Sequence, residues 1–244
     1  MTDSESTGGR TVLAVGGHIG DMDLAAGPAL AQNVLDGGTS VLVALTPGER
    51  GHPRMPVAEY REVKIAEGRA FAEAIGAEFE VFDDLSDGLL TDDESTAARL
   101  ALVLRRYRPD TLIAHWKHSI HSDHERASAL AVRARYLAGL PGWHTDVAGD
   151  EGRRHGTARL VYSENWEDAE GYAATHHLPI GDEAFGLWRS AIEGEMFARG
   201  ETYGFRYIDY YTAQLTLRGC LAGCSRAVGF SQDRIAFTAS LSQQ

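Results

Sequence analysis

The sequence predicts an α/β fold in which a mainly parallel sheet carries helices on both faces. Short apolar runs alternate with longer stretches of helical periodicity from residue 11 to residue 162. Strands separated by helical crossovers pair in parallel. The chain has 244 residues, 43% of them hydrophobic and 24% charged, which fits one ordinary globular domain. We therefore expect a single Rossmann-like domain over residues 11–240, after a disordered N-terminus of residues 1–10.

The first elements follow from an apolar run and two glycine pairs. Residues 11–15 (TVLAV) form a short buried strand, and the glycines at 16–17 turn the chain into a helix over about residues 21–35. The pair at 37–38 ends that helix, because glycine favours turns and helix ends. A second strand follows over residues 40–45.

The middle elements show the same alternation. Val63, Ala66 and Ala70 recur at helical spacing and predict a helix over about residues 57–75, followed by a third strand over 79–82. The next amphipathic helix contains Ala97, Leu100, Leu104 and Tyr107, and Pro109 stops it.

The remaining elements complete the predicted sheet. We expect a fourth strand over residues 111–115, a helix over about 123–137 and a fifth strand over 159–162, after a polar, glycine-rich stretch. From about residue 182 the chain is expected to be mostly helical and to pack on the sheet.

Charge and composition exclude several classes of protein. The net charge of −12 repels phosphate backbones, which argues against nucleic-acid binding. Two cysteines cannot make a disulfide framework. No apolar run approaches the roughly 18 residues that cross a membrane, and the acidic N-terminus does not resemble a signal peptide. These features predict a cytoplasmic protein, and they leave the oligomeric state open, a homo-oligomer included.

Polar side chains follow the ends of the predicted strands. Ligands of parallel sheets bind at the carboxyl ends of the strands, and the segments there contain His18, Asp21 and Glu49. Four of the ten histidines fall between His115 and His124. A catalytic zinc ion takes three nitrogen or oxygen ligands and keeps one open position. A metal site of His18, Asp21 and His124 meets this need, and a solvated histidine-rich loop is the alternative.

Two other kinds of site fit the sequence poorly. GGHIG after the first strand is not the G-x-G-x-x-G of dinucleotide-binding proteins, and no acidic residue follows at the expected distance. No G-x-S-x-G motif exists, which argues against a serine hydrolase.

The order of motifs resembles the LmbE-like, PIG-L type N-deacetylases, a zinc-dependent family that removes acyl groups from amino sugars and related metabolites. The resemblance covers residues 11–230. The family motif A-H-P-D-D-E corresponds to GHIGDM at 17–22, T-x-G-E to TPGE at 46–49, and the helix motif E-x3-A-x3-L-G begins at Glu67. The pair D-G corresponds to 87–88, R-P-D to 108–110, and H-P-D-H to HSDH at 121–124.

The resemblance implies a role for each matching residue. It implies one Zn2+ ion, or another divalent metal, bound by His18, Asp21 and His124. It implies that His121 steadies the oxyanion or protonates the leaving amine, and that Asp123 orients an imidazole. The expected substrate contacts are Asp87, Lys64, which stands where the family often has arginine, and Glu49.

One departure affects the chemistry. The family's general base, the first aspartate of H-P-D-D, corresponds to Gly20, and the following glutamate corresponds to Met22. A general base contributes about 10²–10⁴ in rate, but zinc alone lowers the pKa of bound water to about 7. Glu49 and Glu164 are candidate replacement bases.

Three hypotheses follow. The first is a zinc-dependent hydrolase that removes an N-acyl group from a small amino sugar or related metabolite. The second is a relative that binds a metabolite without turnover, and the third is a nucleotide-binding α/β protein.

Overall fold

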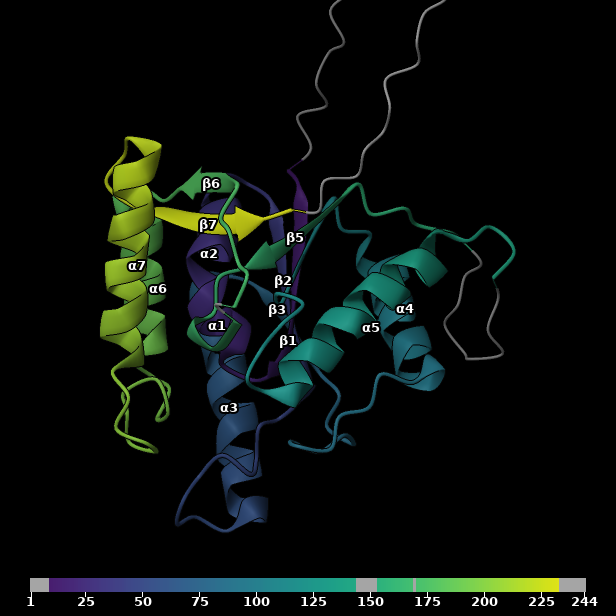
Figure 1. The fold of residues 1–244 in the computed structure, drawn as a ribbon, viewed down its shortest axis with the longest axis horizontal. Coiled ribbons are helices and arrows are strands. Elements are labelled where there is room, and N and C mark those ends of the chain that lie inside the picture. Colours follow the sequence, from purple (N-terminus) through teal and green to yellow (C-terminus); the bar gives the residue numbers. More distant parts are fainter. Residues whose placement is uncertain (1–8, 144–152, 169, 233–244) are drawn as a thin grey trace, which may run out of the picture.

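A seven-stranded sheet in the order β3-β2-β1-β4-β5-β7-β6 forms the centre of the protein (Figure 1). The computed structural model describes residues 9–143, 153–168 and 170–232, so the predicted disordered N-terminus lies mostly outside the described residues. The elements along the chain are β1 (Thr11–His18), α1 (Asp21–Ala25), α2 (Gly27–Leu35), β2 (Thr39–Thr46), α3 (Val57–Ile75), β3 (Glu78–Val81), α4 (Glu94–Tyr107), β4 (Thr111–Ala114), α5 (Ser122–Gly139), β5 (Arg159–Ser163), η1 (Trp166–Asp168), β6 (His176–Pro179), α6 (Asp182–Ile192), α7 (Tyr207–Ala222) and β7 (Ala227–Ser231).

The predicted α/β fold is confirmed. Strands β1 to β5 pair in parallel, while β7 is antiparallel to both β5 and β6. The central strands are continuous apolar runs because helices cover both of their faces. Helices α4 and α5 pack on one face, and α1, α2, α3, α6 and α7 pack on the other.

Two details differ from the sequence prediction. The helix expected over residues 21–35 is interrupted at Ala26, and α2 restarts with Pro28 in its first turn, because proline suits the start of a helix and not its interior. The short strands β6 and β7 were not predicted; β6 is largely exposed and lacks the apolar pattern of the inner strands.

The topology brings the site residues together. The chain runs from β1 to β2 and β3 on one side of the sheet, then returns to place β4 on the other side of β1. Ligands bind at such a switch point, outside the carboxyl ends of the strands. His18 ends β1 beside Thr46 of β2, and β4 ends directly before His115. Within the described segments, no helix has the length and apolar character that crossing a membrane requires.

Candidate active site

The turn from β1 to α1 brings His18 and Asp21 together. Gly20 between them has φ 104° and ψ −28°, a conformation that side-chain-bearing residues rarely adopt. The turn lets Asp21 Oδ2 accept a hydrogen bond of 2.8 Å from the backbone N–H of His18 and lie 3.2 Å from His18 Nδ1. Both side chains therefore direct a ligand atom to the same point.

Two histidines from the β4–α5 region approach the same carboxylate. His115 follows β4, and His124 lies in the first turn of α5. Their Nε2 atoms lie 3.1 Å and 3.3 Å from Asp21 Oδ2, and their rings are stacked with centroids 3.9 Å apart. Both are almost completely buried.

Asp168 fixes the orientation of both imidazoles. Its carboxylate accepts from His115 Nδ1 at 2.8 Å and from His124 Nδ1 at 3.0 Å. Burial raises the pKa of Asp168, but His115 and His124 outweigh it and hold the pKa well below the usual range. Each Nε2 therefore presents a lone pair, the arrangement of a metal-binding histidine with a carboxylate behind it. Sequence reasoning missed Asp168, because it is an isolated aspartate on a short 3₁₀ turn.

His124 and His115 differ in what occupies their Nε2 lone pair. The backbone N–H of Gly17 donates to His115 Nε2 at 3.2 Å, whereas no backbone donor reaches Nε2 of His124 among the described residues. We therefore expect His124 rather than His115 to bind a metal ion. His115 is held by Gly17 and Asp168.

The predicted metal ligands His18 and His124 both lie close to the carboxylate of the third, Asp21. Asp21 Oδ2 lies 3.2 Å from His18 Nδ1 and 3.3 Å from His124 Nε2. Ligands about 2.0–2.1 Å from a tetrahedral zinc lie roughly 3.3–3.4 Å apart. Among the described residues, the groups of donors close enough to hold a metal ion are His18, His121 and His124; Asp21, His115 and His124; and His18, Asp87 and Asp123. The set of His18, Asp21 and His124 is not one of these groups and stays a prediction. Burial lowers the pKa of His124, but Asp21 and Asp168 raise it to about 10, and the same negative field favours a bound cation.

Asp87 and Asp123 hold the other side of His18. Its Nε2 lies 3.1 Å from Asp87 Oδ1 and 3.4 Å from Asp123 Oδ2, and Asp123 also accepts from the backbone N–H of Gly88 at 2.7 Å. Asp123 thus lies within reach of an imidazole, and its role in orienting that ring stays a prediction. Glu49 accepts from the backbone N–H of Asp87 at 3.2 Å and holds this loop. Its role as a substrate contact stays a prediction, since it does not line the pocket.

His121 presents a proton donor to the site. It caps α5, where its Nδ1 accepts from the backbone N–H of Asp123 at 3.2 Å. Burial, together with His18 and His124, lowers its pKa, so the imidazole is neutral near pH 7. Because Nδ1 accepts, the single proton resides on Nε2.

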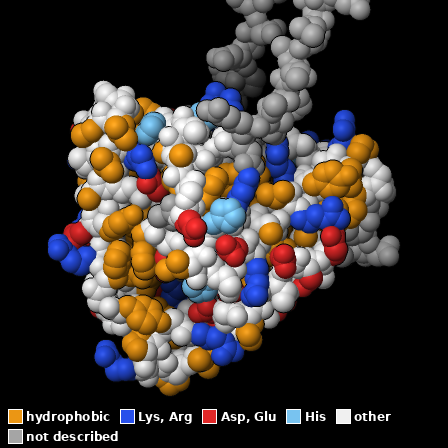
Figure 2. Space-filling model, in the orientation of Figure 1, with side chains coloured by type: hydrophobic (Ala, Val, Ile, Leu, Met, Phe, Trp, Pro, Cys, Tyr) orange, Lys and Arg blue, Asp and Glu red, His pale blue; other side chains and the backbone are white. Residues whose placement is uncertain are grey.

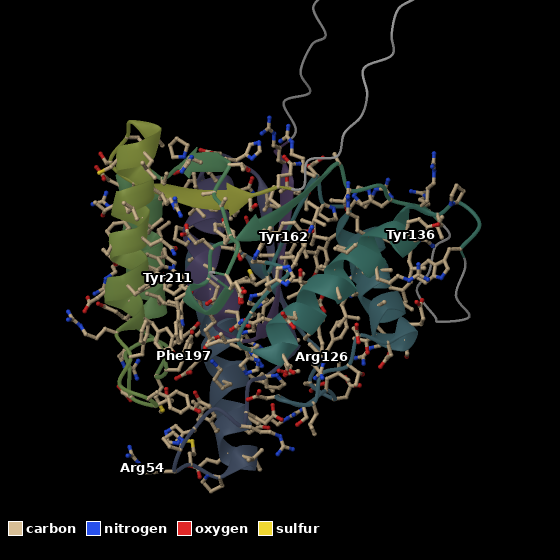
Figure 3. The ribbon with its side chains drawn as sticks, viewed as in Figure 1. Arg54, Arg126, Tyr136, Tyr162, Phe197 and Tyr211 are labelled. Carbon is tan, nitrogen blue, oxygen red and sulfur yellow. The ribbon has the colours of Figure 1, made fainter. Side chains whose placement is uncertain are left out.

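A pocket of about 310 Å³ joins these residues to the C-terminal part of the chain. Phe197 and Tyr211 come from that part and lie on the side of α7 and α3 (Figure 3). Four aromatic side chains besides these two line the pocket, and Lys64 lies on its wall with its ammonium 4.0 Å from the centre of the Phe197 ring. The lining residues are His18, Ile19, Asp21, Leu24, Gly48, Gly51, Tyr60, Lys64, Asp87, His121, His124, Asn165, Trp166, Glu167, Phe197, Thr202, Tyr203, Tyr207 and Tyr211.

The two remaining glutamates near the site differ in their surroundings. Glu164 binds Arg218 through both carboxylate oxygens and does not line the pocket. Glu167 lines the pocket with 21% of its side chain exposed, and its Oε2 lies 3.6 Å from His124 Nδ1. Burial raises the pKa of Glu167.

Comparison with known proteins shows the family to which the chain belongs. The family profile described as PIG-L, GlcNAc-PI de-N-acetylase, matches residues 13–135, half of the chain. The chain belongs to the PIG-L family. Among curated proteins, 4-oxalmesaconate hydratase of Pseudomonas putida is 33% identical over 142 residues, and this match covers 55% of each chain. This PIG-L protein therefore spans only about half the length of its curated relative.

Solved structures show the same fold over nearly the whole chain. A conserved protein of Thermus thermophilus is 25% identical, with TM-score 0.77 and 96% and 99% of the two chains covered. The 4-carboxy-2-hydroxymuconate hydratase GalB of Pseudomonas putida is 24% identical, with TM-score 0.81 and 96% and 100% covered. N,N'-diacetylchitobiose deacetylase of Pyrococcus horikoshii is 16% identical, with TM-score 0.72 and 91% and 83% covered.

Proposed function

We propose that this PIG-L protein is a metal-dependent hydratase, which adds water to a carbon–carbon double bond of a small unsaturated carboxylic acid or removes it. The observation that supports this most is at Gly20, where the family's deacetylases have their general base. A Cβ at Gly20 would lie 2.3 Å from Cε1 and Cζ of Phe197. The space for the deacetylase base is therefore filled, and the 33% identical relative is a hydratase.

Lys64 supports a substrate with a carboxylate group. Its side chain is only 3% exposed, yet it lines the pocket, and its Nζ lies 3.2 Å from where a Cβ of Gly20 would be. Within the described residues it forms no hydrogen bond or ion pair of its own. A buried ammonium that makes no direct ion pair gains a hydrogen-bonded partner when a substrate carboxylate binds to it.

The size and walls of the pocket support a small, flat substrate. About 310 Å³ is at the low end for ligand sites, which suits a small molecule better than a large glycolipid or glycopeptide. Aromatic rings such as Tyr60, Trp166 and Tyr207 line the walls and suit the flat face of a conjugated acid. The surface in Figure 2 mixes acidic and basic side chains and shows no continuous basic area on that face, which fits a small-molecule substrate better than nucleic acid.

Each group at the site has a separate role in the proposed hydration. A divalent ion held by His18, Asp21 and His124 would supply a Lewis acid beside the reacting groups. Glu167 accepts a proton from the attacking water, whose oxygen bonds to one alkene carbon as the π bond breaks. The protonated Glu167 then returns that proton to the neighbouring carbon, so the elements of one water molecule are added and the carboxylate is restored. His121 donates a hydrogen bond from Nε2 to the substrate oxygen on which negative charge develops.

Hydration is tested with a set of unsaturated di- and tricarboxylic acids. Addition of water removes conjugation, so ultraviolet absorbance should fall with the metal-loaded protein and not after chelation. Glu167→Gln should lower kcat by about 10²-fold or more and keep the metal. Glu164→Gln is the matched control, three residues away and outside the pocket, and it should keep full activity. No absorbance change with any acid would refute the proposal.

An N-deacetylase is the second candidate function. The profile that matches is described by de-N-acetylation, and several solved structures with this fold are deacetylases. This candidate keeps the same metal ligands and His121 but lacks the family's base. Release of acetate from N-acetylated amino sugars, with no reaction of unsaturated acids, would favour it over the hydratase.

A further inference from the structure

Two buried carboxyl groups and one partly buried carboxyl group lie around Lys64. Asp23 comes from α1, Glu67 from α3, and Glu195 from the segment between α6 and α7. Asp23 is 4% exposed and Glu195 is completely buried. If all three were ionised, one ammonium would face three negative charges in a largely buried site, which is unfavourable.

Two of these carboxyl groups have donors and one does not. Asp23 Oδ2 accepts from the backbone N–H of Gly20 at 2.9 Å, and Glu67 Oε1 accepts from the backbone N–H of Met196 at 3.0 Å. In the described part of the chain, no N–H or O–H donor reaches either oxygen of Glu195 or Oδ1 of Asp23. The carboxyl groups of Asp23 and Glu195 nevertheless lie within hydrogen-bonding reach of each other.

We propose that Glu195 is a positioning residue for Lys64, acting as a neutral carboxylic acid that donates a hydrogen bond to Asp23. A proton on Glu195 satisfies both unpaired carboxyl groups at once, whereas two carboxylates in contact would repel. Burial and Asp23 both favour the neutral form by raising the pKa of Glu195, and Lys64 opposes them without reversing the direction. The groups facing Glu195 are Asp23 from α1, Lys64, Glu67 and Tyr60 from α3.

The hydrogen bond keeps Lys64 available to the pocket. When Asp23 accepts hydrogen bonds from Gly20 and from Glu195, both of its carboxylate oxygens have a donor, so its attraction for the Lys64 ammonium is weaker. Without the Glu195 donor, Asp23 would draw the Lys64 ammonium towards itself and away from the substrate. Glu195 also lies two residues before Phe197, whose ring contacts the same ammonium. It thus links the C-terminal segment to the α1 turn and to α3.

Glu195→Gln and Glu195→Leu separate this role from a charged one. Glutamine has nearly the same shape and can donate from its amide, so it should keep KM and kcat within about threefold of wild type. Leucine cannot donate, and it should raise KM for a carboxylate substrate about tenfold or more, with a smaller change in kcat. In a Lys64→Met background, Glu195→Leu should raise KM no further. Glu193→Leu, two residues away and exposed, is the matched control and should behave as wild type.

The kinetic part rests on the proposed carboxylate substrate, but the proton on Glu195 is measured without turnover. Infrared spectroscopy of the wild type should show the C=O stretch of a buried protonated carboxylic acid near neutral pH, and Glu195→Gln should lack it. Absence of this band from the wild type, or its persistence in Glu195→Gln, would overturn the assignment. A tenfold loss of affinity in Glu195→Gln would do the same, since it would show that the negative charge is what matters. If the band is found and no acid is hydrated, only the proposed reaction fails.

Discussion

Replacing Gly20 by aspartate restores the base of the family motif in sequence, but the structure predicts that it damages the site. Residue 20 has φ 104°, where a residue with a side chain is strained by about 1–3 kcal/mol. The new Cβ would lie 2.3 Å from two ring atoms of Phe197, and such overpacking adds about 1–3 kcal/mol. We expect Gly20→Asp to lose about 2–6 kcal/mol of its free energy of unfolding and to gain no deacetylase activity.

The double variant Gly20→Asp/Phe197→Ala separates the two contributions. Removing the ring relieves the contact but not the backbone strain. The loss of stability should therefore be smaller than the sum of the two single variants by about 1–3 kcal/mol. Urea unfolding of the four proteins gives this coupling, and release of acetate from N-acetylated amino sugars is measured alongside.

Two outcomes would refute this reasoning. Gly20→Asp with wild-type stability would show that the turn tolerates a side chain and that Phe197 moves easily. A gain of deacetylation by about 10²-fold or more in the double variant would show that the chain is a deacetylase that lacks only its base. The hydratase proposal would then be wrong.

Three further predictions concern the metal centre. Elemental analysis should find no bound metal in any of the variants His18→Ala, Asp21→Ala and His124→Ala. His121→Ala should keep its metal, and its kcat should fall about 10²-fold or more. Loss of metal from His121→Ala would show that His121 is a ligand. Asp168→Asn should weaken metal binding about 10–100-fold by releasing the two imidazoles, and unchanged affinity in a chelator competition would contradict this. Burial and the neighbouring His18 and His124 lower the pKa of His121, so protonation should reduce kcat/KM only below about pH 6.5; an acid limb above that pH would contradict the shift.

The sequence predicted the sheet, and it placed the proposed metal ligands at one edge of it, because both signals are local. Period-3.6 helices and continuous apolar strands specify βαβ units, and the carboxyl ends of parallel strands meet at one edge. His18 and Asp21 belong to one turn, and His124 begins one helix. Asp87, His121 and Lys64, which were also expected at the site, line the same pocket as these ligands. No long-range information was needed to place them together.

The residues that were missed depend on contacts far apart in the sequence. Asp168 reaches His124 across 44 positions, and Phe197 lies against Gly20 from a segment without any recognisable motif. A sequence gives no sign that Glu164 binds Arg218 while Glu167, three residues on, lines the pocket. The interpretation of Gly20 also changes with the structure. In the sequence, Gly20 stands where the family has its general base. In the fold, its positive φ and the Phe197 ring disfavour any side chain there.

The residues predicted from local motifs and the residues that the sequence did not reveal bear on how one kind of metal site serves different reactions. The family profile ends at residue 135 and includes every proposed metal ligand. Glu167, Phe197 and Tyr207, which also line the pocket, lie beyond it. A divalent ion held here would supply a Lewis acid for an amide or for an unsaturated acid. Under the proposed function, the reaction is therefore decided by the residues that hold the substrate and move its protons. Of the groups proposed to act on the substrate, Lys64 and His121 lie within the profile. Glu167 lies beyond it, where similarity to the family's sequence profile gives no guidance about the substrate.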